Sequence, residues 1–274
     1  MIEQPTSFLD TLIRGSRKLE LDYEQASHGA PESAARVRAA VAKFFDGYAA
    51  FNQISPEAAA ASYMATVRSY ANDIKLFVQT GKYPLQIDPA QPMLSRLDYD
   101  LFLILTILVT KHRCAIMEEL MEFTATGKAL VIGVGSGVEL GFVGAPGGGD
   151  AYDLYINPYA RQAFPGWNLR EELYRPTPGQ LHDAVYAIEL LEHLDDPYAF
   201  LKDCRDSLAT GGRAIVTTAT NVAQFDHRYN FVSDEEFERR AADLGLRLEH
   251  KRVIPHDYAR TQIVARNAFY VFST

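Results

Sequence analysis

Apolar residues in the first half of the chain recur at intervals of three and four, which is the spacing of helices that bury one face. Two long stretches carry this pattern, 32–51 and 56–80, and both are rich in residues that favour helices. Gly81 and Pro84 follow the second stretch and predict its end. A third helix is predicted over 93–123, and no strand-like alternation interrupts this half of the chain.

The second half changes to short apolar runs bounded by glycines and polar residues, which are typical of strands buried in a parallel sheet. The predicted strands are 129–134, 152–156, 184–188, 214–218, 246–253 and 269–272. Because helical stretches separate the earlier runs, the connections predict a right-handed, mostly parallel sheet with helices on both faces. The chain is therefore predicted to be an α/β protein, with a small all-α region in residues 1–125 and a doubly wound domain in residues 126–274.

Composition and charge narrow the classes of partner. The chain has 274 residues, 47% hydrophobic and 23% charged, which is typical of soluble globular proteins. Its net charge of -8 and pI near 5.4 argue against a general affinity for nucleic-acid phosphates. Cys114 and Cys204 stand in unrelated contexts without metal-ligand spacing, which indicates a reducing compartment and no disulfide framework.

The sequence also bears on localisation. Residues 1–20 lack the basic start, apolar core and small-residue cleavage site of a secretory signal. The strongest apolar run, 101–110, is about half the length that spans a bilayer, and Lys111 follows it directly. This run is therefore predicted to be a buried helix, and we expect a cytoplasmic protein that does not bind membranes.

Glycine is concentrated in the segment 133–137, GVGSG, which follows the first predicted strand and precedes a short helix. Glycines allow a ligand to approach the backbone, and the helix start offers free N–H groups to an anion. A tight turn without a ligand remains open. The dinucleotide fingerprint needs a third glycine where this chain has Val138, so NAD is disfavoured, and no Gly-Lys-Ser/Thr follows, which excludes a P-loop.

Four segments follow one another in a fixed order from residue 128 to the C-terminus. They are VIGVGSG at 131–137, the region 152–163 around INPY, DAVYAIELLEHL at 183–194, and LATGGR at 208–213. In this order they resemble the first motif, the second strand with its helix, the active-site motif and the turn into strand five of the class I S-adenosylmethionine-dependent methyltransferases. The resemblance implies a Rossmann-like, mostly parallel seven-stranded sheet and S-adenosylmethionine as cofactor.

The resemblance also implies site residues. Those expected to contact the cofactor are Gly133, Gly135, Gly137, Tyr155, Asn157, Glu189 and Leu190. The glycines would hold the methionine part, while Tyr155 and Asn157 stand where ribose and adenine belong. Glu192 and His193 leave the carboxyl end of a predicted parallel strand, so they are candidate catalytic or substrate-contacting residues, although purely structural roles remain open. The histidines show no ligand spacing, and no metal is predicted.

Two positions depart from the family pattern. An acidic residue usually precedes the glycine loop, where this chain has Val131. A second acidic residue usually ends strand two and binds the ribose hydroxyls, and the alignment puts Tyr155 there, with Asp153 two residues earlier on the same strand face. A tyrosine hydroxyl forms hydrogen bonds but carries no charge at neutral pH. The ribose contact is therefore expected to be weaker, to be moved to Asn157 or Asp153, or to be replaced by ring stacking.

Methyl transfer is an in-line displacement that mainly needs alignment and the exclusion of water, which fits a sequence without a diagnostic catalytic pair. The helical region is expected to form a lid that selects a small-molecule acceptor. Its tyrosines Tyr63, Tyr70 and Tyr83 are predicted to be core residues. We also expect the α/β domain to stay folded and in solution when residues 1 to about 124 are removed.

Three alternatives stay open. One is another S-adenosylmethionine reaction in the same fold, either aminocarboxypropyl transfer or the intramolecular cyclisation to azetidine-2-carboxylate, which releases methylthioadenosine. A second is a non-catalytic scaffold that has lost the cofactor, to which the same two departures point. The third and weakest is an NAD enzyme. The sequence predicts neither the acceptor nor the oligomeric state.

Overall fold

Helices fill the first half of the chain. The computed structural model describes residues 7–90, 93–145, 148–256 and 264–274. Residues 1–6, which belong to the segment compared with a secretory signal, lie outside the described residues. The helices before the first strand are α1 (Phe8–Arg14), α2 (Arg17–Ser27), α3 (Glu32–Phe51), α4 (Pro56–Thr80), α5 (Pro84–Ile87), α6 (Arg96–Val109) and α7 (Lys111–Glu122). The predictions for α3 and α4 are confirmed. The single helix predicted over 93–123 is wrong, because the extended backbone of Thr110 separates α6 from α7.

A seven-stranded sheet forms the second half. Its strands are β1 (Ala129–Ile132), β2 (Asp150–Asp153), β3 (Asn168–Glu171), β4 (His182–Ala187), β5 (Leu208–Thr220), β6 (Arg247–Pro255) and β7 (Arg266–Ser273). They lie in the order β3-β2-β1-β4-β5-β7-β6, and β7 is antiparallel to both of its neighbours while the other pairs are parallel. The predicted Rossmann-like, mostly parallel sheet is confirmed. The range predicted for the second strand is wrong, because β2 already ends at Asp153.

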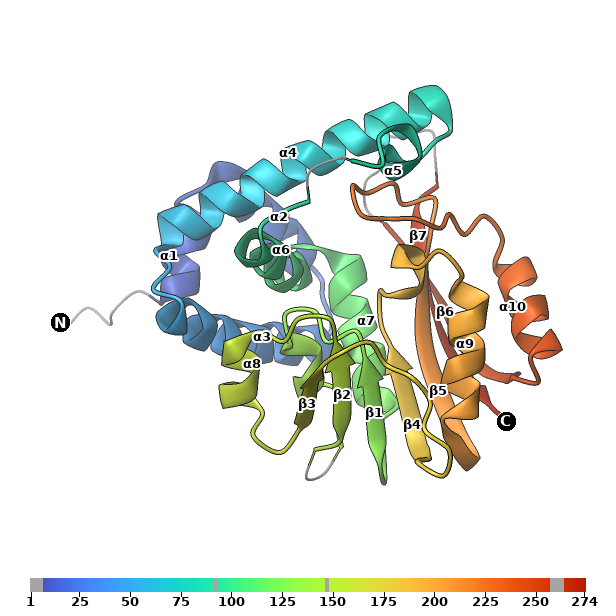
Figure 1. Cartoon of the computed structure of the whole chain (residues 1–274). Coiled ribbons are helices and arrows are strands. Elements are labelled where there is room, and N and C mark those ends of the chain that lie inside the picture. The colour runs from blue at the N-terminus through green and yellow to red at the C-terminus, as the bar shows by residue number, and fades with distance from the viewer. Residues whose placement is uncertain (1–6, 91–92, 146–147, 257–263) are drawn as a thin grey trace.

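Shorter helices connect the strands: η1 (Val138–Gly141), α8 (Pro158–Ala163), η2 (Leu191–His193), α9 (Pro197–Asp206) and α10 (Asp234–Asp243). Two of them, α9 and α10, cover one face of the sheet (Figure 1). Side chains alternate between the faces of a strand, so Leu130 and Ile132 of β1 pack in one cluster with Leu201 and Phe237 of these helices.

The other face of the sheet is covered by the N-terminal helices. Val131 of β1 belongs to one buried cluster with Phe45 of α3 and Leu120 of α7. Val131, which replaces the acidic residue of the family pattern, thus faces packed helices, where a carboxylate would be buried without water. The helical region and the sheet share a core, so the helices form one layer of the α/β fold.

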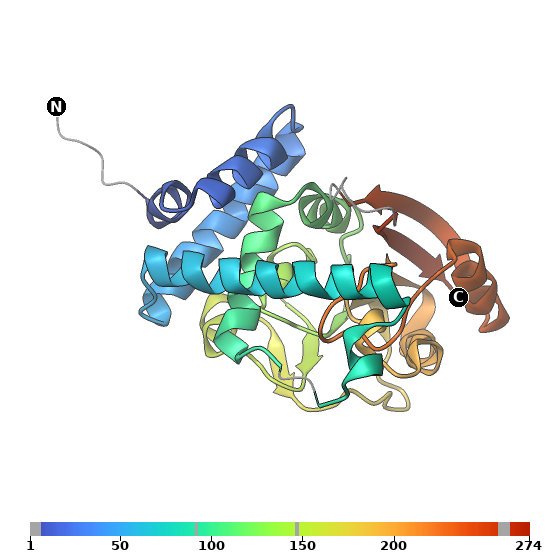
Figure 2. The same cartoon turned by 90° about the horizontal axis from the view of Figure 1, so that it is seen from above.

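Helix α4 crosses the molecule over the carboxyl ends of the strands (Figure 2). Tyr70 in its second half packs with Ala219 at the end of β5 and with Val222, which follows that strand. The prediction that Tyr63, Tyr70 and Tyr83 are core residues is confirmed, since they are 3%, 5% and 0% exposed. The helix therefore lies where the sequence analysis expected a lid.

The remaining predictions concern the apolar run and the cysteines. The run 101–110 lies almost wholly in α6, whose residues from Asp100 to Val109 are mostly buried, as predicted. In the described parts of the chain no helix combines the length and apolar character that crossing a membrane requires. Cys114 and Cys204 are buried and unpaired, in agreement with the expected absence of a disulfide framework.

The shared core changes the expectation for truncation. Removing residues 1–124 would expose the face of the sheet that α3 and α7 cover, including Val131 and Phe269. We now expect residues 125–274 to aggregate or to lose fixed packing, measured by dye binding to exposed apolar surface and by near-ultraviolet circular dichroism. The full chain, measured under the same conditions, serves as the control. A monomeric, cooperatively unfolding 125–274 fragment would show that the sheet does not depend on these helices.

Candidate active site

The site lies where the strand order reverses, between β1 and β4. In open α/β sheets, ligands bind outside the carboxyl ends of the strands at such a switch point. The chain leaves β1 into the glycine turn, residues 133–137, and leaves β4 into the segment 188–193, which ends in η2. The two sequence motifs therefore face the same space, although about fifty residues separate them.

The three glycines of the turn have different surroundings. All have positive φ, and Gly133 and Gly135 line a cavity beside the turn. A Cβ atom on Gly133 would lie 3.1 Å from Leu190, whereas one on Gly137 would lie 2.6 Å from the Cβ of Ala160 in α8. Of the predicted glycine set, Gly133 and Gly135 thus face the cavity, while Gly137 allows a helix to pack closely.

The acidic residue at the end of β2 is Asp153. Its Oδ2 accepts a hydrogen bond from the N–H of Gly135 at 2.9 Å, and its Oδ1 accepts one from the N–H of Tyr155 at 3.1 Å. The alignment puts the family's position at Tyr155, whereas the strand ends at Asp153 and the backbone bends at residues 154 and 155. The chain therefore has a carboxylate beside the glycine turn.

Tyr155 and Asn157 contact helices. The guanidinium of Arg96 stacks 4.5 Å above the ring of Tyr155. Asn157 is 2% exposed, donates through Nδ2 to Asp100 Oδ2 at 2.8 Å and accepts from the N–H of Tyr159 at 2.8 Å as the N-cap of α8. Neither residue lines the cavities described below.

Arg96 and Asp100, near the start of helix α6, connect this helix to the glycine turn and to the N-cap of α8. Arg96 donates through Nη2 to the carbonyl oxygen of Gly135 at 2.8 Å, and its Nε lies 3.2 Å from Asp100 Oδ1 without hydrogen-bond alignment. Tyr48 of α3 donates to Asp100 at 3.3 Å. Burial raises the pKa of Asp100 to about 7, although Arg96 and the two hydrogen bonds oppose this.

Three cavities with shared lining residues lie at this end of the sheet. The outer cavity, about 340 Å³, lies at the ends of β2, β3 and β4 and has apolar walls from Leu154, Leu173 and Leu190. The inner cavity, about 150 Å³, lies between the glycine turn and helices α6 and α7, and shares Gly133, Asp153 and Leu190 with the outer one. Leu154 and Leu173 are 73% and 59% exposed, so they offer apolar surface to a ligand.

A chamber of about 50 Å³ lies behind the inner cavity and shares Tyr99, Arg113 and His193 with it. Its volume leaves room for only a few water molecules. Tyr70 of α4, Tyr99 of α6 and Glu192 of η2 form part of its wall, so elements from both halves of the chain close it. These three spaces are called the outer cavity, the inner cavity and the chamber below.

Glu189 lines both the inner cavity and the chamber. Its Oε2 pairs with Arg113 Nη1 at 3.1 Å, and its Oε1 accepts from Thr217 at 2.8 Å and from Asn267 at 2.7 Å. Arg113 is 6% exposed and also pairs with Glu139 at 3.1 Å. The two remaining predicted cofactor contacts thus line the cavities, because Leu190 lies between the outer and the inner one.

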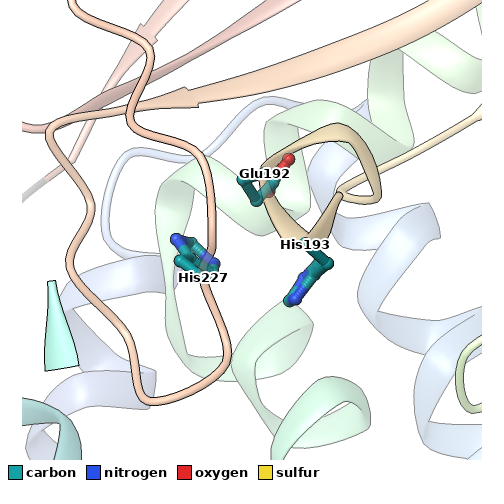
Figure 3. Close-up of side chains that lie close together, drawn as sticks. All are labelled: Glu192, His193 and His227. Atoms are coloured by element: carbon teal, nitrogen blue, oxygen red, sulfur yellow. The ribbon is translucent and has the colours of Figure 1, made fainter. Parts of the chain in front are cut away.

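The two predicted catalytic residues, Glu192 and His193, both line the chamber. Glu192 is 1% exposed, and burial, followed by the charge of Glu189, raises the pKa of its carboxyl group. The Nδ1 of His193 lies 3.3 Å from the carboxylate of Asp226, next to the buried His227 (Figure 3).

Sequence reasoning missed several residues of this site: Arg96, Tyr99, Arg113, Glu139, Asp226 and His227. They come from α6, α7, η1 and the loop after β5, which no local motif connects with the glycine turn. The weak signal available was the charge of Arg96 and Arg113 at the edges of otherwise apolar or helical stretches. Only the folded chain brings these residues together.

The strand order, the glycine turn and the carboxylate at the end of β2 define a Rossmann-like α/β protein with a site at its switch point. No family model matches the chain. The ubiquinone biosynthesis O-methyltransferase of Parvibaculum lavamentivorans is 30% identical over 91 residues, which cover 26% of this chain and 36% of that protein. The match thus spans about a third of that relative's length.

Solved methyltransferase structures also resemble the chain. The N-methyltransferase NodS of Bradyrhizobium japonicum, in complex with S-adenosyl-L-homocysteine, is 14% identical with a TM-score of 0.49 and covers 77% of this chain and 97% of that one. An O-methyltransferase from neocarzinostatin biosynthesis, in complex with S-adenosylmethionine and 2-hydroxy-5-methyl naphthoic acid, is 17% identical with a TM-score of 0.48 and covers 79% of this chain and 70% of that one. The resemblance indicated by the motifs is confirmed by the curated sequence match.

The raised pKa of Asp100 predicts how stability depends on pH. The folded state holds this proton more tightly than the unfolded chain, whose ordinary value is 3.8, so the stability it contributes is complete below pH 4 and is lost as the pH rises towards 7. Asp100→Asn imitates the protonated acid. Relative to this variant, the wild type should lose stability between pH 5 and 7 by at most about 1.4 kcal/mol per pH unit, measured by urea unfolding. Parallel pH profiles of the two proteins would contradict the assignment.

Proposed function

We propose that this chain is an S-adenosylmethionine-dependent methyltransferase that acts on a small-molecule acceptor. The observation that carries the proposal is Asp153, whose carboxylate ends β2, touches the glycine turn at Gly135 and lines both the outer and the inner cavity. A carboxylate at this point accepts hydrogen bonds from the two ribose hydroxyls of an adenosine. The cofactor would then cross the turn, with its adenosine in the outer cavity and its methionine part in the inner one.

The two cavities differ in the way that the two ends of the cofactor do. An adenine ring needs apolar surface on its faces, which Leu154, Leu173 and Leu190 provide in the outer cavity. A methionine end carries a carboxylate, an ammonium and, next to them, the sulfonium. In the inner cavity Arg96 offers donors to the carboxylate, and the ring of Tyr99 offers a face that attracts the sulfonium.

The acceptor would approach the methyl group from the chamber. His193 lines both the inner cavity and the chamber, so it can take a proton from an acceptor whose nucleophile is protonated. Asp226, 3.3 Å from His193 Nδ1, would orient the ring and stabilise its protonated form. The walls from α4 and α6 exclude water from the displacement. A chamber of about 50 Å³ supports a small acceptor that enters as α4 moves, since α6 is tied to the glycine turn.

A second reaction of the same cofactor is favoured by the small size of the chamber. In this reaction the deprotonated α-amine attacks the γ-carbon, the γ-carbon–sulfur bond breaks, and methylthioadenosine leaves together with azetidine-2-carboxylate. The amine must first lose one proton, for which Glu192 or His193 is the available base at the chamber wall. No second substrate is needed, so the space beside the inner cavity can stay closed.

The cofactor assignment is tested by a matched pair of substitutions at the end of β2. Asp153→Asn removes the charge that would bind the ribose, and we expect it to weaken S-adenosylmethionine binding at least tenfold, since a hydrogen bond to a charged group contributes about 1.5–3 kcal/mol. Tyr155→Phe removes the hydroxyl of a residue that lines none of the three cavities described above and should leave the affinity within twofold. Titration calorimetry measures both.

Two results would contradict this assignment. An absence of heat and of a thermal shift with either S-adenosylmethionine or S-adenosylhomocysteine on the wild type would favour a non-catalytic scaffold. A loss of affinity in Tyr155→Phe with no loss in Asp153→Asn would return the ribose contact to the tyrosine that the alignment indicated. Circular dichroism of both variants shows whether the fold is retained.

The two reactions are separated by their products. With S-adenosylmethionine alone, a methyltransferase should form no S-adenosylhomocysteine, and product should appear only after a small acceptor is added. Cyclisation would instead yield methylthioadenosine and azetidine-2-carboxylate in equal amounts without any addition. Mass spectrometry measures all three, with heat-inactivated protein as the control for spontaneous decay. Enzyme-dependent methylthioadenosine would replace methyl transfer with the second reaction.

A further inference from the structure

Three side chains of the chamber wall gather ligand atoms of the kind that bind transition metals. Glu192, His193 and His227 each offer one such atom, and these atoms lie within 4.8 Å of one another. Figure 3 shows that Glu192 and His193 come from η2 and that His227 comes from the loop between β5 and α10. We propose that these three side chains bind a divalent transition-metal ion.

Hydrogen bonds hold both imidazoles in the form that a metal requires. The Nδ1 of His227 lies 2.6 Å from the carbonyl oxygen of Val222, which can only accept, so this nitrogen carries the proton. The Nδ1 of His193 lies 3.3 Å from the carbonyl oxygen of Asp226, which can only accept, so this nitrogen carries the proton, and the carboxylate of Asp226 is also 3.3 Å away. Each Nε2 is left with its lone pair. Metal-binding histidines are oriented in this way by a carbonyl or a carboxylate on the other ring nitrogen.

Glu192 supplies an independent indication. Its side chain is almost completely buried at 1% exposure, and its Oε2 has no hydrogen-bond partner among the described residues. A buried carboxylate oxygen without a donor is costly, and native structures satisfy nearly all such atoms with protein groups, water or an ion. A metal ion bound to Oε2 would satisfy it.

The balance of charge around the cluster also favours a cation. Arg113 is already engaged by Glu139 and Glu189. Glu192 and Asp226 remain, and the imidazole of His193 is the nearest group to Asp226 that can carry a positive charge. A divalent ion would compensate both carboxylates at once. Two imidazoles with one carboxylate are a ligand set of zinc and iron(II) sites, whereas magnesium prefers oxygen ligands alone.

The location of the cluster suggests the use of the ion. Three protein ligands leave a coordination position open, which in catalytic sites takes water or a substrate atom. Because the ligands line the chamber, that position would face the space assigned above to the acceptor. An acceptor hydroxyl or carboxylate bound there would be held near the methyl group, and a hydroxyl would lose its proton more easily through the ion itself, because Nε2 of His193 would then be a ligand and not a base. This use rests on the proposed function, but metal binding itself does not.

Metal binding is tested on the full chain without a histidine tag, after treatment with a chelator and in the absence of cofactor. Titration with Co²⁺, followed by its visible absorption, should show one saturable site per chain, from which Zn²⁺ displaces it. Glu192→Gln and His227→Gln should each lower the Co²⁺ affinity at least tenfold. His28→Gln removes an exposed histidine of α2's C-cap and is the matched control, which should bind as the wild type does.

An absence of saturable Co²⁺ binding to the wild type at millimolar concentration would overturn the proposal. Wild-type affinity in both site variants, or an equal loss in His28→Gln, would do the same. Glu192→Gln keeps the shape of the side chain, so it decides the matter should His227→Gln fail to fold by circular dichroism. Calorimetry with S-adenosylmethionine on the chelated protein keeps the two proposals apart, because retained cofactor binding with no metal binding would reject the metal site alone.

Discussion

Burial of charge at the carboxyl ends of the parallel strands is the constraint on which the rest of this site depends. Arg113 of α7 is 6% exposed and holds Glu139 from η1 and Glu189 from the end of β4. Removing one partner of such a buried group strongly destabilises a protein, by about 3–5 kcal/mol, because the other charge is left without water. Helix α7 also packs on the sheet, so the same helix fixes a layer of the core and the floor of the site.

Helix α6, like α7, contributes both to the hydrophobic core and to the site. Its apolar residues lie in the shared core, while Arg96 and Asp100 at its start reach the glycine turn and the N-cap of α8. A helix held at both places cannot shift without changing the turn that lines the inner cavity. Helix α6 and the glycine turn therefore hold each other in place. The predicted boundary between residues 125 and 126 marks a change in the sequence pattern, but the hydrophobic core continues across it.

The fold was predictable where local signals were strong. Helix α4 matches its predicted range because Ser55 caps its start and Gly81 ends it in a left-handed conformation. Strand β3 was not located, since Leu169 is its only buried residue and no apolar run marks it. The second strand was predicted to run to residue 156 but ends at Asp153, because apolar character alone does not show where an extended backbone turns.

Predictability falls further at the site. The segments after β1 and β4 were found because each joins a strand end to a turn whose residue types reveal it. Arg113, Asp226 and His227 were not, because their partners lie far along the chain and only the packing of helices over the sheet sets those contacts. Contacts between residues far apart in the chain produce no periodicity or fixed spacing in the sequence. The motifs of the site could therefore be predicted, whereas the residues that surround them could not.

On the proposed function, the outer and inner cavities would bind the cofactor, whereas the chamber would determine which reaction takes place. The outer and inner cavities depend on the ends of β1 and β2 and on the glycine turn, and they suit one elongated ligand with an apolar and a charged end. The chamber depends on α4, α6 and η2, has a volume of about 50 Å³, and shares Tyr70, Phe102 and His112 with a neighbouring cavity of about 180 Å³. On the proposed function, methyl transfer to an acceptor larger than the chamber would require α4 to move, whereas a reaction within the cofactor would not. Under that proposal the residues around the chamber would decide the chemistry, and the glycine turn is compatible with either outcome.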